Sequence, residues 1–403
     1  MRKQMNITFS PPDITELEIQ AVAEAMRSGW ITTGPKTKEF ERKLAEFMGT
    51  TTAVCLNSAT AAMELILRVL GVGPGDEVIT SAYTYTASAS VIHHVGAQIV
   101  LVDTAPGSYF MDLNKLSAAI TKRTKVIIPV DLGGVMADYH RILEIIETKK
   151  GLFTSSNEIQ EIFNRVVILA DAAHSIGASY YGRPSGSVAD FTAFSFHAVK
   201  NLTTAEGGVV TWQVREGLDN ELLYKKFQLL SLHGQSKDAL SKMRLNSWDY
   251  DIVLPGYKYN MTDLTAAFGL VQLKRFPDLM AKRHRIIRSY DDVLLPLGIE
   301  SLQHVGCNHT GNGHLYLSRI PQIGENQRNA LIAQMAERGI ACNVHFKPLP
   351  LFTAYRNLGF DIVDFPNAYA QYQSEITLPS HTLLSNYEVA YVAETFKNLV
   401  KRL

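Results

Sequence analysis

Residues 191–208 read FTAFSFHAVKNLTTAEGG, and this stretch decides the fold. Positions 191–196 alternate apolar residues with small and hydroxyl residues, which predicts a buried strand. A segment rich in turn residues follows, and VVTW at 209–212 is expected to be the returning strand. Lys200 therefore lies on the connection between two core strands and not on a solvated helix face. A lysine in that place is either a side chain that snorkels from the core to solvent or an amine held in a site.

The neighbours of Lys200 in the sequence favour a site. Ser195 lies five residues before it, and two threonines follow it, so hydroxyl groups occur on both sides. Gly207 and Gly208 carry no Cβ and let the backbone approach a ligand closely. Taken alone, this stretch leaves open the alternative of a surface lysine after a core strand.

A second stretch, RVVILAD at 165–171, places an acid near this lysine. It is a continuous apolar run that ends in Asp171, which predicts a central strand of a parallel sheet. The ligand crevice of an open α/β sheet lies at the carboxyl ends of the strands. An aspartate there is a helix N-cap, a metal ligand or the partner of a pyridinium nitrogen. Pyridoxal phosphate (PLP) needs an anion at its ring nitrogen and an amine for its aldehyde, and Asp171 with Lys200 supplies both.

The composition is that of a globular enzyme. The 403 residues are 46% hydrophobic and 19% charged, enough for a large core and two domains. Lys plus Arg and Asp plus Glu both total 39, so no overall field favours nucleic acid or an anionic membrane. Cys55, Cys307 and Cys342 have neither disulfide-framework nor zinc-ligand spacing. Without an apolar leader or a span of ~20 apolar residues, the expected location is the reducing cytoplasm.

Two helices are expected, one near the N-terminus and one before a C-terminal domain. A helix over 13–27 would begin with Asp13 and Glu16 as a capping-box-like pair. A long helix over roughly 263–296 would lead into a C-terminal domain. Between them, strands at 98–103 and 125–130 alternate with helical segments, which is the βαβ rhythm of a parallel sheet.

The segments DAAH at 171–174 and SFHAVKNLTTAEGG at 195–208 resemble the DegT/DnrJ/EryC1/StrS family of PLP-dependent aminotransferases of nucleotide-linked sugars. The resemblance implies the α/β architecture of fold type I PLP-dependent transferases. A large domain over 1–275 would hold a mostly parallel seven-stranded sheet between helices, and 276–403 would form a smaller α+β domain. It also implies PLP as cofactor, no metal, and a homodimer with active sites at the subunit interface.

The resemblance assigns roles to particular residues. Lys200 would bind the cofactor and then act as general base, while Asp171 would keep the ring nitrogen protonated. The other expected cofactor contacts are Ala59, Thr60 and Ser195 at the phosphate, Tyr85 against the pyridine ring, His174 at the ring hydroxyl, and Lys258 or Asn260 crossing from the partner subunit to the phosphate. From the residues alone, the segment at 57–60 is equally a plain N-cap by Asn57 or Ser58. A lone tyrosine such as Tyr85 is more often a core residue, and Lys258 and Asn260 would be ordinary loop residues.

Three residues are weaker candidates for substrate contact. Trp30 and Thr33 lie in a loop that in the family reaches towards a substrate site, often that of the partner; the alternative is a helix stop with a packed tryptophan. His345 lies in a stretch resembling one near the substrate mouth; the alternative is a partly buried structural histidine. The span 239–255 is either a loop over the nucleotide or packing at a dimer interface.

The expected function is transfer of the amino group of L-glutamate to a keto-sugar nucleotide. A UDP-linked 4-keto-6-deoxyhexose for surface polysaccharide biosynthesis is the specific expectation. Relatives that dehydrate their substrate carry histidine where this chain has Lys200, so lysine favours transamination. The alternatives are a keto-cyclitol aminotransferase and a non-catalytic PLP-binding or regulatory protein. A dinucleotide-binding enzyme is excluded because no Gly-x-Gly-x-x-Gly follows an early strand.

Overall fold

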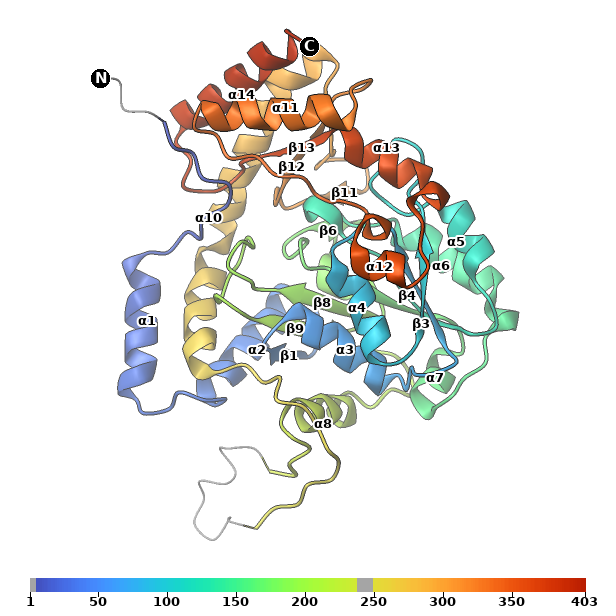
Figure 1. Ribbon diagram of the computed structural model, residues 1–403. Coiled ribbons are helices and arrows are strands. Elements are labelled where there is room, and N and C mark those ends of the chain that lie inside the picture. The colour runs from blue at the N-terminus through green and yellow to red at the C-terminus, as the bar shows by residue number, and fades with distance from the viewer. Residues whose placement is uncertain (1–4, 238–248) are drawn as a thin grey trace.

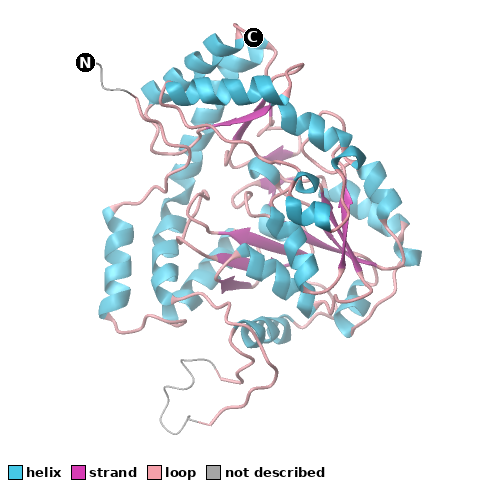
Figure 2. Cartoon of the chain, viewed as in Figure 1, coloured by secondary structure: helices cyan, strands magenta, loops and turns pink. Residues whose placement is uncertain are grey.

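The computed structural model describes residues 5–237 and 249–403 (Figure 1). Most of the span 239–255, for which a nucleotide loop or an interface role was expected, lies outside the described residues. Helices and strands alternate along the first two thirds of the chain, and a smaller helical unit with its own short strands follows (Figure 2).

A seven-stranded sheet forms the centre of the molecule and confirms the predicted fold class. Its strands are β1 (Ala53–Leu56), β2 (Glu77–Ser81), β3 (Gln98–Val102), β4 (Thr124–Ile128), β5 (Val167–Asp171), β8 (Phe191–Ser195) and β9 (Gly208–Trp212). The spatial order is β1-β9-β8-β5-β4-β2-β3. Strand β9 pairs antiparallel with both neighbours, and the other adjacent strands pair in parallel. The strands are continuous apolar runs because helices cover both faces of the sheet.

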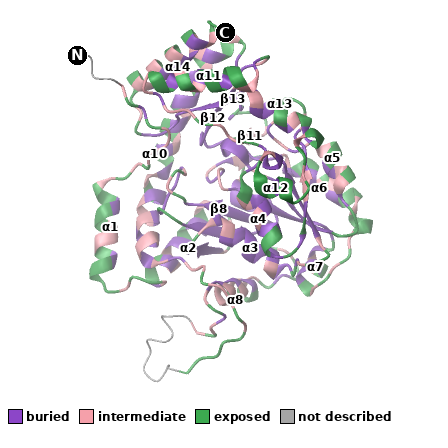
Figure 3. Cartoon of the chain, in the orientation of Figure 1, coloured by how far each residue is buried: buried purple, intermediate pink, exposed green. Residues whose placement is uncertain are grey.

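Each face of the large sheet packs its own hydrophobic core. One core joins the sheet to α2 (Pro35–Phe47) and α6 (Tyr139–Thr148) through residues such as Phe40 and Ile142. The other joins it to α3 (Ala59–Val69), α4 (Thr86–His94), α7 (Glu158–Phe163) and α8 (Asn220–Ser231) through residues such as Leu65 and Ile92. The burial colours of Figure 3 follow this arrangement, with buried strands between helices that expose their outer faces.

The predicted long helix is present as α10 (Asp263–Leu294), which leads to a smaller unit. There, β10 (Glu300–Ser301), β12 (Tyr316–Arg319) and β13 (Glu375–Leu378) form a three-stranded sheet beside α11 (Glu325–Glu337), α13 (Pro366–Ser374) and α14 (Asn386–Val400). A third core, with Ile7, Tyr290 and Phe396, holds this unit together. The division at 275/276 stays a prediction, and it falls within α10.

The start of the first helix differs from the expectation. Helix α1 spans Glu16–Arg27, and its capping box consists of Thr15 and Glu18 rather than Asp13 and Glu16. The carboxylate of Asp13 instead accepts hydrogen bonds from Arg275 at 2.6 Å and from Thr382 at 2.6 Å. The Arg275 guanidinium gives the Asp13 carboxylate a stronger hydrogen bond than a backbone N–H would, which explains why Asp13 does not cap α1.

Two further observations concern the whole described chain. Cys55, Cys307 and Cys342 are free, as expected from their spacing. Within 5–237 and 249–403, no helix is both long and apolar enough to cross a membrane.

Candidate active site

Lys200 lies on the loop after β8, and its side chain enters a cavity of about 390 Å³. Asp171, His174 and Ser195 line the same cavity. In the described part of the chain, the Lys200 amine has no hydrogen-bonding or ion-pair partner. Desolvation lowers the pKa of Lys200 to about 8, although the charge of Asp171 opposes this shift. A lysine with such a pKa is in part a free amine near neutral pH, as a nucleophile or general base must be.

Asp171 is the last residue of β5 and lies at the carboxyl edge of the sheet, as predicted. Its Oδ2 accepts a hydrogen bond from the Ser88 hydroxyl at 2.6 Å, and its Oδ1 accepts one from the Ala173 N–H at 3.2 Å. Burial raises the pKa of Asp171, while these two hydrogen bonds and the charge of Lys200 act against the rise. The carboxylate is thus fixed in a desolvated place where a cationic partner interacts most strongly.

His174 follows Asp171 by three residues and lines the cavity beside it. Its Nδ1 accepts a hydrogen bond from the backbone N–H of Gly133 at 3.2 Å. Burial, and then the charge of Lys200, hold the pKa of His174 well below its usual value, so the ring is neutral. Because Nδ1 is an acceptor, the neutral ring carries its proton on Nε2. His174 therefore offers the cavity a hydrogen-bond donor.

The start of α3 forms a cradle suited to an anion. Ser58 is the N-cap, and its hydroxyl accepts a hydrogen bond from the Ala61 N–H at 3.0 Å. The N–H groups of Ala59 and Thr60 precede the first helical hydrogen bonds, and both residues line the Lys200 cavity. A Cβ at Gly208 would lie 2.4 Å from the carbonyl carbon of Ser58. Glycine at 208 is therefore required for β9 to approach this helix start.

Tyr85 is not a core residue, contrary to the alternative interpretation. It directly precedes α4, its side chain is 62% exposed, and it lines the Lys200 cavity. Its ring centroid lies 6.1 Å from that of Phe346, which is in the loop after α11. An exposed ring at a cavity wall can stack on a flat ligand.

Four predicted residues lie outside the cavity of this chain. The Asn260 amide donates a hydrogen bond to the Thr33 hydroxyl at 2.6 Å, and that hydroxyl donates to the carbonyl of Met261 at 2.6 Å. The Trp30 indole N–H donates to the carbonyl of Thr33 at 3.1 Å. The Lys258 side chain is exposed, and partial desolvation lowers its pKa. Their expected contacts, which involve a partner subunit, stay predictions.

His345 lies at the cavity, as the resemblance implied, and is also a buried histidine held by hydrogen bonds, as in the alternative interpretation. It lines the cavity, while its Nδ1 lies 2.9 Å from the Thr377 hydroxyl and its backbone N–H donates to Glu375 at 2.8 Å. Burial lowers the pKa of His345 to about 3, with the charge of Lys200 adding to the shift. The ring is therefore a neutral, structurally held part of the cavity wall.

Several cavity residues were not found from the sequence. They are Phe9, Ser10, Thr84, Asp131, His197, Val199, Glu206, His314, Leu315, Asn343 and Phe346. Most of them come from the N-terminal segment, the loop that carries Lys200 or the small unit, so no local pattern joins them to the strand ends. Phe346 could have been predicted, because it belongs to the stretch beginning at His345 that was already expected near the substrate mouth.

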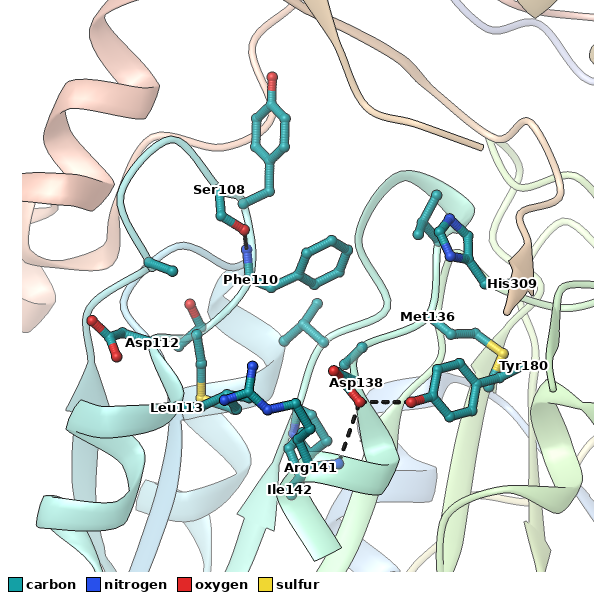
Figure 4. A pocket seen from close by; sticks show the side chains of 18 of the residues that line it. Ser108, Phe110, Asp112, Leu113, Met136, Asp138, Arg141, Ile142, Tyr180 and His309 are labelled. Atoms are coloured by element: carbon teal, nitrogen blue, oxygen red, sulfur yellow. Dashed lines mark hydrogen bonds between the residues drawn. The ribbon is translucent and has the colours of Figure 1, made fainter. Parts of the chain in front are cut away.

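A second cavity, of about 400 Å³, lies beside α5 (Leu113–Ala119) and α6 (Figure 4). Its acid Asp138 accepts hydrogen bonds from the Tyr180 hydroxyl at 2.6 Å and from the Arg141 N–H at 3.3 Å, as the dashed lines show. This carboxylate is occupied as a helix cap, and neither Lys200 nor Asp171 lines the cavity. The described residues also contain no group of three or more His, Cys, Asp or Glu side chains placed to hold a metal.

The residues of the Lys200 cavity fit PLP. The chemistry of the donor set matches the cofactor: an amine at Lys200, an acid at Asp171, a neutral donor at His174 and backbone N–H groups at the start of α3. Ala59 and Thr60 at that helix start line the cavity, where their N–H groups can bind a phosphate group.

Comparisons with known proteins agree with this geometry. The model of the DegT/DnrJ/EryC1/StrS aminotransferase family matches residues 12–397. The chain is 39% identical over 401 residues to the spore coat polysaccharide biosynthesis protein SpsC of Bacillus subtilis, covering 98% of this chain and 97% of that protein. It is 38% identical over 353 residues to UDP-4-amino-4-deoxy-L-arabinose--oxoglutarate aminotransferase of Shewanella sediminis, covering 86% and 84%.

A solved structure gives the same result. The PLP form of the putative sugar aminotransferase Spr1654 of Streptococcus pneumoniae superposes with a TM-score of 0.95 and 54% identity, covering 98% of this chain and 99% of that chain. The chain accordingly belongs to the DegT/DnrJ/EryC1/StrS aminotransferase family and is a PLP-dependent sugar aminotransferase.

Proposed function

We propose that this enzyme moves the amino group of L-glutamate to a keto-sugar nucleotide, specifically a UDP-linked 4-keto-6-deoxyhexose used for surface polysaccharide. The observation that carries the proposal is the pairing of Lys200 and Asp171 in one cavity of about 390 Å³. The names of two relatives support the substrate class, since one acts on a UDP-linked 4-amino sugar with oxoglutarate and the other serves polysaccharide biosynthesis.

Residues on three sides of the cavity hold the cofactor. Asp171 would accept a hydrogen bond from the protonated ring nitrogen, and Ser88 keeps the Asp171 carboxylate in place. His174 would donate from Nε2 to the ring hydroxyl, and the N–H groups of Ala59 and Thr60 would bind the phosphate together with the Ser195 hydroxyl. Tyr85 would stack on the pyridine ring. When bound, PLP supplies the electron sink that makes the Cα–H bond of an amino acid acidic.

Lys200 moves the proton. Its amine, partly neutral because its pKa is about 8, accepts the proton from Cα of the amino donor. In the opposite direction it delivers a proton to the sugar carbon that receives nitrogen. Desolvation of the cavity strengthens each of these electrostatic contacts.

We further propose that the enzyme works as a cytoplasmic homodimer whose sites lie at the subunit interface. In this arrangement Lys258 of one protomer reaches the cofactor phosphate of the other, because its side chain is exposed whereas the Asn260 amide is bonded to Thr33. Trp30 and Thr33 would approach the partner's substrate in the same way.

The test is the visible spectrum of the purified protein with PLP, before and after L-glutamate, for the wild type and Lys200→Ala. The wild type should show the absorbance band of covalently bound cofactor and lose this band when glutamate is added. Lys200→Ala should not form the band, with or without glutamate. A panel of keto-sugar nucleotides and a keto-cyclitol is then added, and UDP-4-keto-6-deoxyhexose should restore the band fastest. Restoration by the cyclitol alone, or no response to glutamate, would refute the proposal.

A further inference from the structure

One wall of the Lys200 cavity comes from the N-terminal segment of the chain and from the loop after α11. We define the aromatic wall as Phe9, His345 and Phe346, all of which line the cavity. The rings of Phe9 and His345 stack, with centroids 5.7 Å apart and planes 20° apart. The ring of Phe346 lies 5.9 Å from that of His174 at 28°. The aromatic wall therefore extends from the N-terminal segment to the side chain expected beside the cofactor ring.

Phe9 is held between two fixed points. On one side, Ile7 is buried and its backbone bonds to the Gly339 carbonyl at 2.7 Å and to the Ala341 N–H at 3.0 Å. On the other side, the Ser10 hydroxyl donates to the carbonyl of Val199 at 3.1 Å, directly before Lys200. The segment thus crosses from the small unit to the loop that carries the lysine.

Gly339 allows the N-terminal segment to pack closely against the end of α11. A Cβ there would lie 1.8 Å from the carbonyl oxygen of Met5. The N-terminal segment therefore packs directly on the end of α11, so Phe9 is a defined part of the cavity and not a trailing end.

The aromatic wall is uncharged, and this decides which group of a substrate it can contact. Phe9 and Phe346 are neutral, and His345 is neutral because burial lowers its pKa to about 3. Glutamate carries two carboxylates and a nucleotide carries phosphates, and each of these groups requires cationic or N–H partners. A sugar ring offers instead an uncharged face of C–H groups, which an aromatic side chain covers well.

We infer that Phe9 is a specificity-determining residue that contacts the apolar face of the keto-sugar ring and takes no part in binding the amino donor. This inference rests on the proposed function. Ser10 acts as a positioning residue, because its bond to Val199 fixes Phe9 relative to Lys200.

The experiment measures the two half-reactions separately for wild type, Phe9→Ala and Phe9→Leu. In Phe9→Ala, the glutamate half-reaction should stay within about threefold of wild type, whereas KM for the keto-sugar nucleotide should rise at least about tenfold. Phe9→Leu keeps an apolar side chain without the flat aromatic face. Its KM for the keto-sugar nucleotide should therefore lie between the values for wild type and Phe9→Ala. Tyr387→Ala, which removes an exposed aromatic outside the cavity, is the matched control. Calorimetric titration of the amine form with the aminated sugar nucleotide should show the same order of affinities, and thermal melting should exclude loss of folding.

The outcomes are distinct. An unchanged KM and affinity for the sugar nucleotide in Phe9→Ala would overturn the inference while leaving the proposed function intact. Equal losses in both half-reactions would also overturn it, since Phe9 would then act through the cofactor side. If wild type binds none of the keto-sugar nucleotides, the proposed function itself is wrong and the inference falls with it.

Discussion

The cavity has two walls that differ in the origin of their residues. The cofactor wall, defined as Ala59, Thr60, Tyr85, Asp171, His174, Ser195 and Lys200, comes from strand ends and helix starts around the large sheet. The aromatic wall comes from the N-terminal segment and from the loop after α11. Polar groups dominate the first, and neutral rings form the second. Under the two proposals above, chemistry and substrate choice would be carried by separate parts of the chain, and mutations can test one wall at a time.

The largest expected effect is at the centre of the cofactor wall. Lys200→Ala removes both the amine that binds the cofactor and the general base, so the overall rate should fall by about 10⁴-fold or more. Steady-state transamination and the visible spectrum are the measurements. Lys225→Ala, at an exposed lysine on α8, is the control and should keep wild-type activity. A Lys200→Ala enzyme with a normal spectrum and turnover would contradict the assignment.

The second prediction compares two buried aspartates near neighbouring strand ends. Asp131 follows β4 and accepts hydrogen bonds from Ser175 and Tyr139, both at 2.7 Å, and from the Ala137 N–H at 3.0 Å. Asp171→Asn should lower kcat by at least about a hundredfold, because the ring nitrogen loses its anion.

Asp131→Asn should act mainly on stability. The substitution replaces one acceptor oxygen with an NH2 donor, so the hydrogen bond from Ser175 must be lost or reversed, at a cost of about 1–3 kcal/mol. Chemical denaturation and single-turnover kinetics on both variants separate the two effects. The interpretation fails if Asp131→Asn loses as much kcat as Asp171→Asn does.

The third prediction concerns pH. The neutral Lys200 amine is the reactive form, and its pKa is lowered to about 8. The rate at which apoprotein attaches PLP covalently should therefore rise with pH through a midpoint at about pH 8 and level off near pH 9, an increase of roughly tenfold between pH 7 and pH 9. Stopped-flow absorbance records this rate. In Asp171→Asn the midpoint should move to lower pH, because the charge of Asp171 raises the pKa of Lys200. A rate still rising at pH 10 would mean that the amine is not desolvated.

The fourth prediction decides between Lys258 and Asn260. Lys258→Ala should weaken PLP binding about tenfold, since one charge-assisted contact to phosphate is lost. Asn260→Ala should leave the affinity almost unchanged and lower the melting temperature, because its amide bonds Thr33 within the chain. Equilibrium titration of PLP on the apoproteins measures both. The reverse order of affinities would assign the phosphate contact to Asn260.

The smallest effect is expected in the aromatic wall at His345. His345→Phe keeps the ring but loses the contact with the Thr377 hydroxyl, so KM for the sugar nucleotide should change by about twofold at most. A large rise in KM would show that the imidazole nitrogen itself contacts the substrate.

Part of the cofactor wall could be predicted from the sequence because Asp171 and Lys200 follow local rules, and the resemblance to a family supplied the other residues. A strand that ends in an acid, a helix that begins with small residues and a lysine in a turn between core strands each place one group at the carboxyl edge of the sheet. The resemblance to a family then assigned the roles. The alternation of apolar runs with helical segments predicted a parallel sheet, and the resemblance implied the fold type and the seven strands.

The aromatic wall could not be predicted in the same way. Phe9 lies in a segment without periodic structure, and its place depends on contacts with Ala341 and with Val199, which are distant in the sequence. Asp13 shows the same limit, because its bond to Arg275 replaced the helix cap expected for it. Whether Trp30 contacts a substrate depends on a second copy of the chain.

The close approach at Gly208 has a thermodynamic consequence. Gly208 begins β9, pairs with Leu56 at the end of β1 and touches the first turn of α3. A ligand on that turn binds only the folded arrangement of these three elements, so occupancy adds directly to the free energy of unfolding this edge of the sheet. Amide hydrogen exchange in β1 and β9 should therefore slow on loading with PLP, while exchange in β3, at the opposite edge, changes least. Cofactor occupancy could then be measured as local protection of the edge strand β1 and its neighbour β9.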